Sequence, residues 1–302
     1  MNNSKLWTKD FIIIAATTFF VALSFYLLMT TMTLYAIEQF NASESQAGLA
    51  SGIFVIGALL TRILAGKYMD IIGRKKMLCG SLLIFFIATL LYFLVDNLGL
   101  LIIVRFLHGA AFGVATTAMP TAIMDIIPRE RRGEGVSYFS LSPTLATAIG
   151  PFLGIFIMQY ADFSTMFAVC TGFALMSNVI ILLARIPEIT VTEKQRESMK
   201  RFSWQDFFEK SAIPISMIIL FTAMAYSGIM AFLNSYAISI NLTTWASFFF
   251  IVYAAVNVIS RPFAGRLLDA KGDNIVMYPA LLMFMLSLIL LSQAEYGFIL
   301  LL

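Results

Sequence analysis

The stretch GKYMDIIGRKK, residues 66–76, decides the fold, because it places five charges between apolar runs in a chain that is 60% hydrophobic and only 12% charged. A second stretch, GRLLDAKGDNI, occupies residues 265–275 and repeats the two glycines and the aspartate of the first. It too lies between apolar runs. A charged segment that recurs at equivalent places along a chain indicates an internal duplication.

The composition excludes an ordinary soluble domain. Mean hydropathy is +0.88 over the 302 residues, whereas soluble domains are about half apolar and about a quarter charged. The apolar residues form runs that reach the length of about 20 residues that a helix needs to cross a bilayer. Because hydrocarbon offers the backbone no hydrogen-bond partner, such spans must be helices. We therefore predict an all-α polytopic membrane protein with no nucleic-acid partner, and with neither disulfide nor metal site at Cys79 and Cys170.

Nine apolar runs are long enough to be spans, and a tenth begins at Tyr296. The nine lie near residues 11–37, 46–66, 77–95, 98–124, 135–158, 163–184, 211–236, 245–265 and 275–292. The first run is too long for a signal peptide. The tenth ends on FILLL without a flanking charge or polar tail, so we expect a chain that is truncated within this span.

Lysines and arginines lie on one side of these runs. The loops after the first, third, fifth, seventh and ninth runs contain neither residue, whereas the N-terminus and the remaining loops carry them. By the positive-inside rule the N-terminus is cytoplasmic. We expect a multi-pass protein of the cell membrane.

The two charged stretches can be aligned over sixteen residues, TRILAGKYMDIIGRKK at 61–76 with SRPFAGRLLDAKGDNI at 260–275. The identical pairs are Arg62 and Arg261, Ala65 and Ala264, Gly66 and Gly265, Asp70 and Asp269, and Gly73 and Gly272. Each copy follows the second span of its half, as in a parallel duplication. We predict two pseudo-symmetric six-helix bundles, at residues 1–184 and 211–302, joined by a cytoplasmic linker at 185–210. The second bundle is incomplete, so that about nine and a half spans are present.

Four motifs give the chain a family resemblance. GKYMDIIGRKKML resembles motif A of the major facilitator superfamily, although Tyr68 and Ile71 depart from the pattern. RFLHGAAFG resembles motif B, AIGPFLG resembles the antiporter motif C with two of its glycines replaced, and PRERRG resembles the element that follows span four. The resemblance covers the whole chain and implies the fold of that superfamily.

At motif A the resemblance implies a latch in which Asp70 holds the cytoplasmic side closed. The residues expected to take part are Gly66, Asp70, Gly73, Arg74, Asp125 and Arg129. Gly66 and Gly73 would allow tight turns where helix meets loop. For the basic residues 74–76 an equally good interpretation is that they only set the orientation. Orientation requires no acid, and Asp70 is repeated at Asp269.

Arg105 follows the start of span four by seven residues, with no acid near it in its own segment. An intramembrane arginine by default faces the bundle interior and has a partner, and the resemblance implies a part in proton coupling. The alternative is that Arg105 snorkels to the outer interface. His108 lies on the same helix face, so a proton relay through both residues is one hypothesis and a structural, hydrogen-bonded histidine is the other.

In motif C, Gly150 and Gly154 permit close helix contact and Pro151 bends the helix. The resemblance associates this motif with exporters; plain helix packing is the alternative interpretation.

The resemblance places the solute cavity along spans one, four and seven. The candidate residues are Tyr26, Met29, Tyr35, Tyr226 and Asn234. Thioethers and aromatic faces suit amphipathic or cationic solutes, but span one carries no acid before Glu38 at its outer end, so the proton-carrying group is unassigned.

We expect a monomeric secondary transporter that exports small amphipathic or drug-like molecules in exchange for protons by alternating access. Its partners are the solute, protons and the lipid bilayer. We expect no catalytic residue, no cofactor and no metal, because the chain has no H-E-x-x-H motif and no P-loop. The alternatives are a proton symporter that takes up a metabolite, and a truncated remnant that does not transport.

Overall fold

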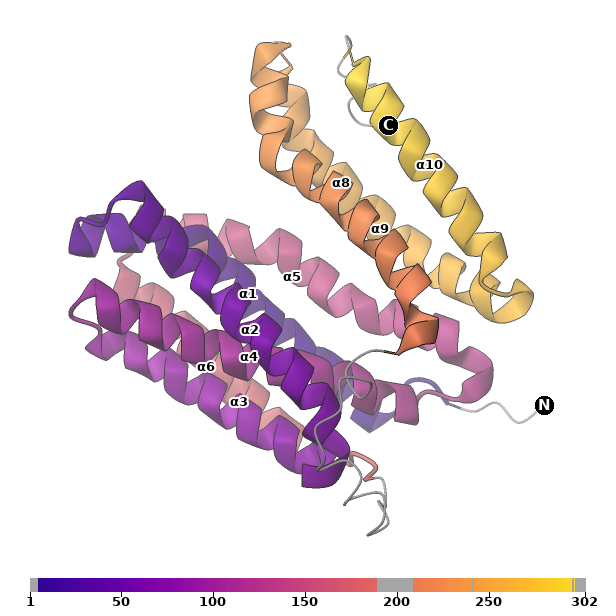
Figure 1. Cartoon of the computed structure of the whole chain (residues 1–302), viewed down its shortest axis with the longest axis horizontal. Helices are drawn as coiled ribbons and strands as arrows, with labels where there is room; N and C mark the ends of the chain where they lie inside the picture. Colours follow the sequence, from indigo (N-terminus) through magenta and orange to yellow (C-terminus); the bar gives the residue numbers. More distant parts are fainter. Residues whose placement is uncertain (1–4, 189–208, 241, 295, 297–302) are drawn as a thin grey trace. The chain divides into compact units, whose positions relative to one another are not determined.

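The computed structural model describes residues 5–188, 209–240, 242–294 and 296. Their long helices are α1 (Lys9–Phe40), α2 (Glu44–Ile72), α3 (Arg74–Leu91), α4 (Leu98–Ile126), α5 (Arg132–Tyr160), α6 (Phe163–Leu182), α8 (Ile213–Ser239), α9 (Thr243–Lys271) and α10 (Asn274–Ser292) (Figure 1). Three short 3-10 turns are η1 (Tyr92–Leu94), η2 (Arg129–Arg131) and η4 (Lys210–Ala212). No strand occurs among the described residues.

The predicted all-α membrane architecture is confirmed. Eight helical segments in the described ranges are long and apolar enough to cross a membrane. They comprise α1 to α6, residues 210–227, which include η4 and the first part of α8, and α10. The predicted span at 245–265 coincides with α9, which is not among the eight, so this span stays a prediction.

The chain divides into two compact units, Met1–Phe202 and Ser203–Leu302. The boundary falls inside the predicted linker at 185–210, most of which lies outside the described residues. The predicted tenth span is also outside them, except for Tyr296. The bundle limits at 184 and 211 therefore stay predictions.

Side-chain caps start several helices in the first unit. Ser43 and Gln46 form a capping box at α2, and Asn97 accepts a hydrogen bond from the backbone of Leu100 at the start of α4. Asp162 caps α6, with 2.8 Å from its Oδ1 to the backbone nitrogen of Thr165. Hydrogen bonds from the hydroxyl and the backbone of Thr165 hold the pKa of this carboxyl below its usual value. These caps occupy N–H groups that would otherwise have no partner.

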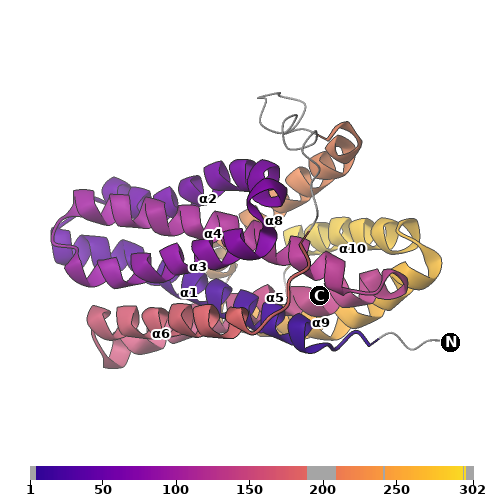
Figure 2. The same ribbon diagram turned by 90° about the horizontal axis from the view of Figure 1, so that it is seen from below.

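In the first unit, α2 packs on α4, α1 on α5 and α6, and α3 on α4 and α6 (Figures 1 and 2). The α2–α4 contact is made backbone to backbone. A Cβ at Gly109 would lie 2.0 Å from the carbonyl oxygen of Phe54, and one at Gly113 would lie 2.3 Å from that of Ala58. Only glycine permits this approach, and it brings motif B in α4 directly against α2.

Two large clusters of buried apolar side chains lie in the first unit, beside a smaller one of Ala22, Leu23 and Ala146. One contains Phe54, Leu78 and Met119, and the other contains Leu27 and Tyr92. Together they fix α1 to α6 as one packed body.

The second unit contains α8, α9 and α10, and it repeats the turn of the first. Gly73 follows α2 with φ +102°, and Gly272 follows α9 with φ +86°. Each glycine donates its N–H to the carbonyl four residues earlier, to Met69 at 3.0 Å and to Leu268 at 2.9 Å. The duplicated sequence thus forms the same helix end in both units, with a positive φ that glycine adopts without strain.

Candidate functional site

The motif A turn (residues 66–76) is organised around the side chain of Arg74, which is 7% exposed. Its Nε donates to Asp70 Oδ1 at 2.9 Å, and its Nη1 contacts Asp125 Oδ2. One guanidinium thereby joins the end of α2, the start of α3 and the end of α4 through charge-assisted hydrogen bonds. The structure thus brings together three residues of the predicted latch. Asp70 and Asp125 keep about a third of their side-chain surface exposed.

Of the other residues predicted for the latch, Gly73 forms the turn itself, whereas Arg129 and Gly66 lie apart from this ion-pair network. Arg129 is exposed in η2, where its neighbour Arg131 instead pairs with Glu134 at 2.7 Å. Gly66 lies inside α2, and a Cβ there would meet nothing within 4 Å. The tight turn expected at Gly66 is therefore wrong, since α2 continues to Ile72 and the turn falls at Gly73 alone.

Glu188, which we did not predict, completes the motif A turn. Its Oε2 accepts from the backbone N–H of Arg74 at 2.9 Å, and its Oε1 from that of Lys75 at 3.1 Å. Lys75 Nζ in turn donates to the carbonyl of Ala184 at 2.8 Å. A carboxylate at a helix N-terminus satisfies free N–H groups and complements the helix dipole. Glu188 therefore caps α3 from the segment that follows α6.

Replacing Glu188 by glutamine should weaken this cap. The amide has a single acceptor oxygen and no charge, so α3 loses one of two hydrogen bonds, at a cost of about 1 kcal/mol. We expect the apparent unfolding midpoint of the purified protein to fall by about 2–4 °C. Glu130→Gln is the matched control, because Glu130 is exposed in η2 and the charge change is the same. Equal midpoints for the two variants would contradict the capping role.

Arg105 lies fully buried in α4, with 0% of its surface exposed. Its Nε donates to the carbonyl of Ala50 and its Nη2 to that of Ser51, both at 3.1 Å. Its guanidinium also lies 4.6 Å from the centroid of the Phe54 ring, a cation–π contact. The side chain thus points toward α2 inside the unit, rather than to the outer interface as the alternative interpretation had it.

Tyr92 connects Arg105 to His108. Arg105 Nη1 donates to the Tyr92 hydroxyl at 3.4 Å, and that hydroxyl lies 3.0 Å from His108 Nδ1. His108 Nε2 is buried without a hydrogen-bond partner among the described residues. Buried polar atoms without partners are rare and costly. The predicted Arg105–His108 pair is therefore connected through a third residue, which the α4 sequence alone could not have indicated because Tyr92 belongs to η1.

The motif C glycines pack α5 against α1. A Cβ at Gly150 would lie 2.6 Å from Tyr26 Cβ, and one at Gly154 would lie 3.0 Å from Thr31 Cγ2. Pro151 lies inside α5 between them. The arrangement has the close helix contact that both interpretations of this motif require.

A cavity of about 460 Å³ lies within the first unit, between α1, α2, α4 and α5. Aromatic rings form much of its wall: Phe25, Tyr26, Phe54, Phe112 and Phe139. Its polar side chains come from Thr18, Tyr26, Arg62 and Thr116. The volume is that of a pocket for a drug-sized molecule.

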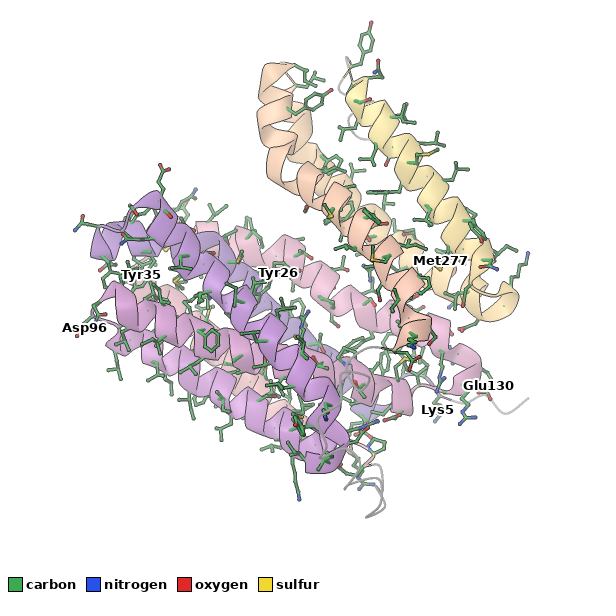
Figure 3. The ribbon with its side chains drawn as sticks, in the orientation of Figure 1. Lys5, Tyr26, Tyr35, Asp96, Glu130 and Met277 are labelled. Atoms are coloured by element: carbon green, nitrogen blue, oxygen red, sulfur yellow. The ribbon has the colours of Figure 1, made fainter. Side chains whose placement is uncertain are left out.

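Of the two tyrosines in α1 that were predicted for the solute cavity, one lines the cavity of the first unit and the other does not. Tyr26 lines the cavity of the first unit, midway along α1, whereas Tyr35 lies near the end marked by Asp96 (Figure 3). Tyr35 packs on Phe163 and Phe167 of α6, outside that cavity.

Two further predicted residues make contacts of other kinds. Met29 Sδ lies 3.4 Å from the Ser51 hydroxyl, and Tyr226 stacks on Tyr253 within the second unit. The side chain of Asn234 lies outside the described residues. No cluster of three His, Cys, Asp or Glu side chains suited to a metal occurs in the described ranges.

Comparison with known proteins gives one family. The family model of the Major Facilitator Superfamily matches residues 14–302. The chain is 28% identical over 293 residues to an uncharacterized MFS-type transporter of Methanocaldococcus jannaschii, covering 95% of this chain and 75% of that protein. It is 25% identical over 225 residues to the multidrug resistance protein MdtL of Vibrio parahaemolyticus, covering 72% of this chain and 56% of that relative. The crystal structure of the human organic anion transporter MFSD10 matches 97% of this chain and 80% of its own, with a TM-score of 0.68 at 14% identity, which shows a shared fold.

Proposed function

The chain belongs to the major facilitator superfamily, and on this basis we propose that it exports small amphipathic molecules from the cytoplasm in exchange for protons. Its relatives are transporters and not enzymes. The relative named for multidrug resistance supports export as the direction. Alternating access is the mechanism that a duplicated fold of this kind supports.

One observation carries the proton part of the proposal. Arg105 lies fully buried without an acidic partner in the described ranges, and Tyr92 connects it to a histidine that has a free ring nitrogen. A proton taken up by the His108 imidazole places a second positive charge beside the guanidinium. Two desolvated like charges are costly at this separation. Proton uptake therefore favours a conformation in which the site is hydrated, and this links protonation to opening.

The motif A turn supplies the gate in this proposal. The charge network of Asp70, Arg74 and Asp125 joins three helix ends on the side that we assign to the cytoplasm. Its two carboxylates are partly exposed and can exchange partners when the helix ends move. Opening of the cytoplasmic side breaks the ion pairs of Arg74 with Asp70 and Asp125, and closure forms them again.

Asp70→Asn should slow transport at least about tenfold, the effect of about 1.4 kcal/mol on the barrier, without reducing the amount of protein inserted. Asparagine keeps the shape but removes the charge that pairs with Arg74. The measurement is dye accumulation in everted, respiring vesicles, with nigericin added to collapse the pH gradient. Asp96→Asn, the same change at the opposite end of the unit (Figure 3), is the control and should transport at the wild-type rate.

Two outcomes would overturn the proposal. Accumulation that continues after the pH gradient has collapsed would exclude proton coupling. Uptake by right-side-out vesicles, with no export, would identify a symporter that takes up its solute. A wild-type rate for Asp70→Asn would separately remove Asp70 from the gate.

A further inference from the structure

Arg62 is a cation on the wall of the apolar cavity in the first unit. It lies in α2, ten residues before the helix ends at Ile72, which is about 15 Å along the helix axis. Its Nη2 donates to Thr116 Oγ1 of α4 at 3.2 Å. That hydroxyl donates its own proton to the carbonyl of Phe112 at 2.7 Å, so its oxygen is free to accept from Arg62. Arg62 is an exposed residue of this unit, and the hydrogen bond directs its guanidinium toward α4.

Arg62 has no counter-charge in the described part of the chain. The ion pairs of Arg74 with two aspartates and of Arg131 with Glu134 do not include it. No Asp or Glu lines the cavity. A guanidinium carries five N–H donors in a planar fork, and one hydrogen bond to Thr116 leaves most of them for another partner. A carboxylate is the group whose geometry this fork matches in two hydrogen bonds.

The rest of the wall is apolar. Phe25, Phe54, Phe112 and Phe139 contribute rings, and Met119 contributes a thioether. Such a wall holds an apolar or aromatic body with little selectivity for its shape. A molecule that satisfies both parts of the cavity is amphipathic, with one anionic end.

We propose that this cavity binds small amphipathic carboxylates, with Arg62 as the counter-charge and the aromatic wall around the apolar part. The proposal rests on the proposed transport function for its biological role, since it names the class of solute. The Met-rich and aromatic composition of spans one and seven also suits cationic solutes. The proposed site excludes them, because Arg62 repels a cation placed next to it.

The internal repeat supports a role beyond membrane orientation. Arg62 is matched by Arg261 in α9, whereas the basic residues Arg74 and Lys75 are matched by Asp273 and Asn274. A charge needed only for orientation belongs near the helix end, where the second copy keeps Lys271 but has lost these two basic residues. The second copy keeps the arginine that lies within the helix.

The test measures binding rather than transport. The full chain in nanodiscs is titrated by calorimetry with three naphthalene probes, 2-naphthoate, 2-naphthamide and 2-naphthylmethylammonium, and empty nanodiscs are subtracted. Wild-type protein should bind 2-naphthoate at least about tenfold more tightly than the other two, as expected for a charge-assisted pair of about 1.4 kcal/mol. Arg62→Gln should lose this preference while 2-naphthamide binds as before, because glutamine can still donate to Thr116. Lys76→Gln, an exposed residue outside the cavity, should keep the preference.

Each other result overturns the site. These results are equal affinity for the three probes, preference for the ammonium, no binding of any probe, or a naphthoate preference that survives Arg62→Gln. The binding of 2-naphthamide reports that the variant is folded. Carboxylate binding without dye transport in vesicles would refute the transport proposal and leave this site standing. Proton-driven dye export without a naphthoate preference would refute the carboxylate site and leave the transport proposal standing.

Discussion

Arg105→Met should remove proton-driven accumulation of solute while leaving a folded protein. Methionine fills the same buried space without charge, and replacing a buried ion by an apolar side chain of similar size is often neutral for stability. The carbonyls of Ala50 and Ser51 that Arg105 contacts belong to α2 and keep their helical hydrogen bonds. What disappears is the charge that makes protonation of His108 costly. We therefore expect accumulation against a gradient to fall at least about a hundredfold, the effect of about 2.7 kcal/mol.

Counterflow separates coupling from structural damage in this variant. Exchange of labelled for unlabelled dye without a pH gradient needs the alternating movement but no proton. It should persist in Arg105→Met at a rate within a few-fold of the wild type. Arg105→Lys is the charge-preserving comparison and should retain part of the accumulation. Wild-type accumulation by the methionine variant would show that Arg105 has no part in coupling, and loss of counterflow as well would assign it a structural role.

Gly109→Ala should leave little folded protein. The new Cβ would lie 2.0 Å from the carbonyl oxygen of Phe54 and 2.7 Å from its Cα. These are backbone atoms, so relief requires α2 and α4 to separate along their whole contact. Overpacking of a well-packed interior costs about 1–3 kcal/mol and more where the backbone must shift, and we expect the upper end of this range or beyond. The unfolding midpoint and the fraction of monodisperse protein in gel filtration measure the loss.

Gly172→Ala is the matched control for this prediction. Gly172 lies in α6 and a Cβ there would meet nothing within 4 Å. Alanine favours helix over glycine by about 1 kcal/mol, so this variant should be as stable as the wild type or more so. If the unfolding midpoint of Gly109→Ala equalled that of Gly172→Ala, the close α2–α4 contact would not exist in the protein.

The helices could be predicted from apolar runs because a bilayer imposes their length, but hydropathy locates the edge of the hydrocarbon and not the end of the helix. The run at 46–66 is part of α2, which continues to Ile72, and the run at 245–265 is part of α9, which continues to Lys271. The backbone hydrogen bonds of a helix continue beyond the hydrocarbon into water, where a charged side chain carries no desolvation cost. This difference explains why, of the turns expected at Gly66 and Gly73, only the one at Gly73 is found.

The candidate site could be predicted where its residues belong to one motif or one helix face, and at Asp125 because the ends of spans two and four lie on the same side of the membrane. Asp70 and Arg74 are four residues apart in motif A and were expected together. Glu188 lies 114 residues from Arg74, its partner at the start of α3, and no local spacing indicates such a contact. Arg62 was visible as a repeated residue, but its place on a cavity wall depends on how α2 packs against α4. Tertiary contacts of this kind follow from packing, which a single sequence does not specify.

The cap at Glu188 attaches the chain that follows α6 to the start of α3. The chain after α6 is fastened at three points: Arg185 donates its N–H to Asp10 at 2.9 Å, Ala184 accepts from Lys75, and Glu188 binds the first turn of α3. A pulling force on the chain beyond Glu188 is therefore transmitted to the turn at Gly73, between α2 and α3, rather than to the C-terminal end of α6. A force-sensing reporter inserted at residues 185–187 would separate Glu188 from α6 and so break this connection. The same reporter inserted beyond Glu188 would keep the contact of Glu188 with α3 and would measure the force that reaches the turn at Gly73.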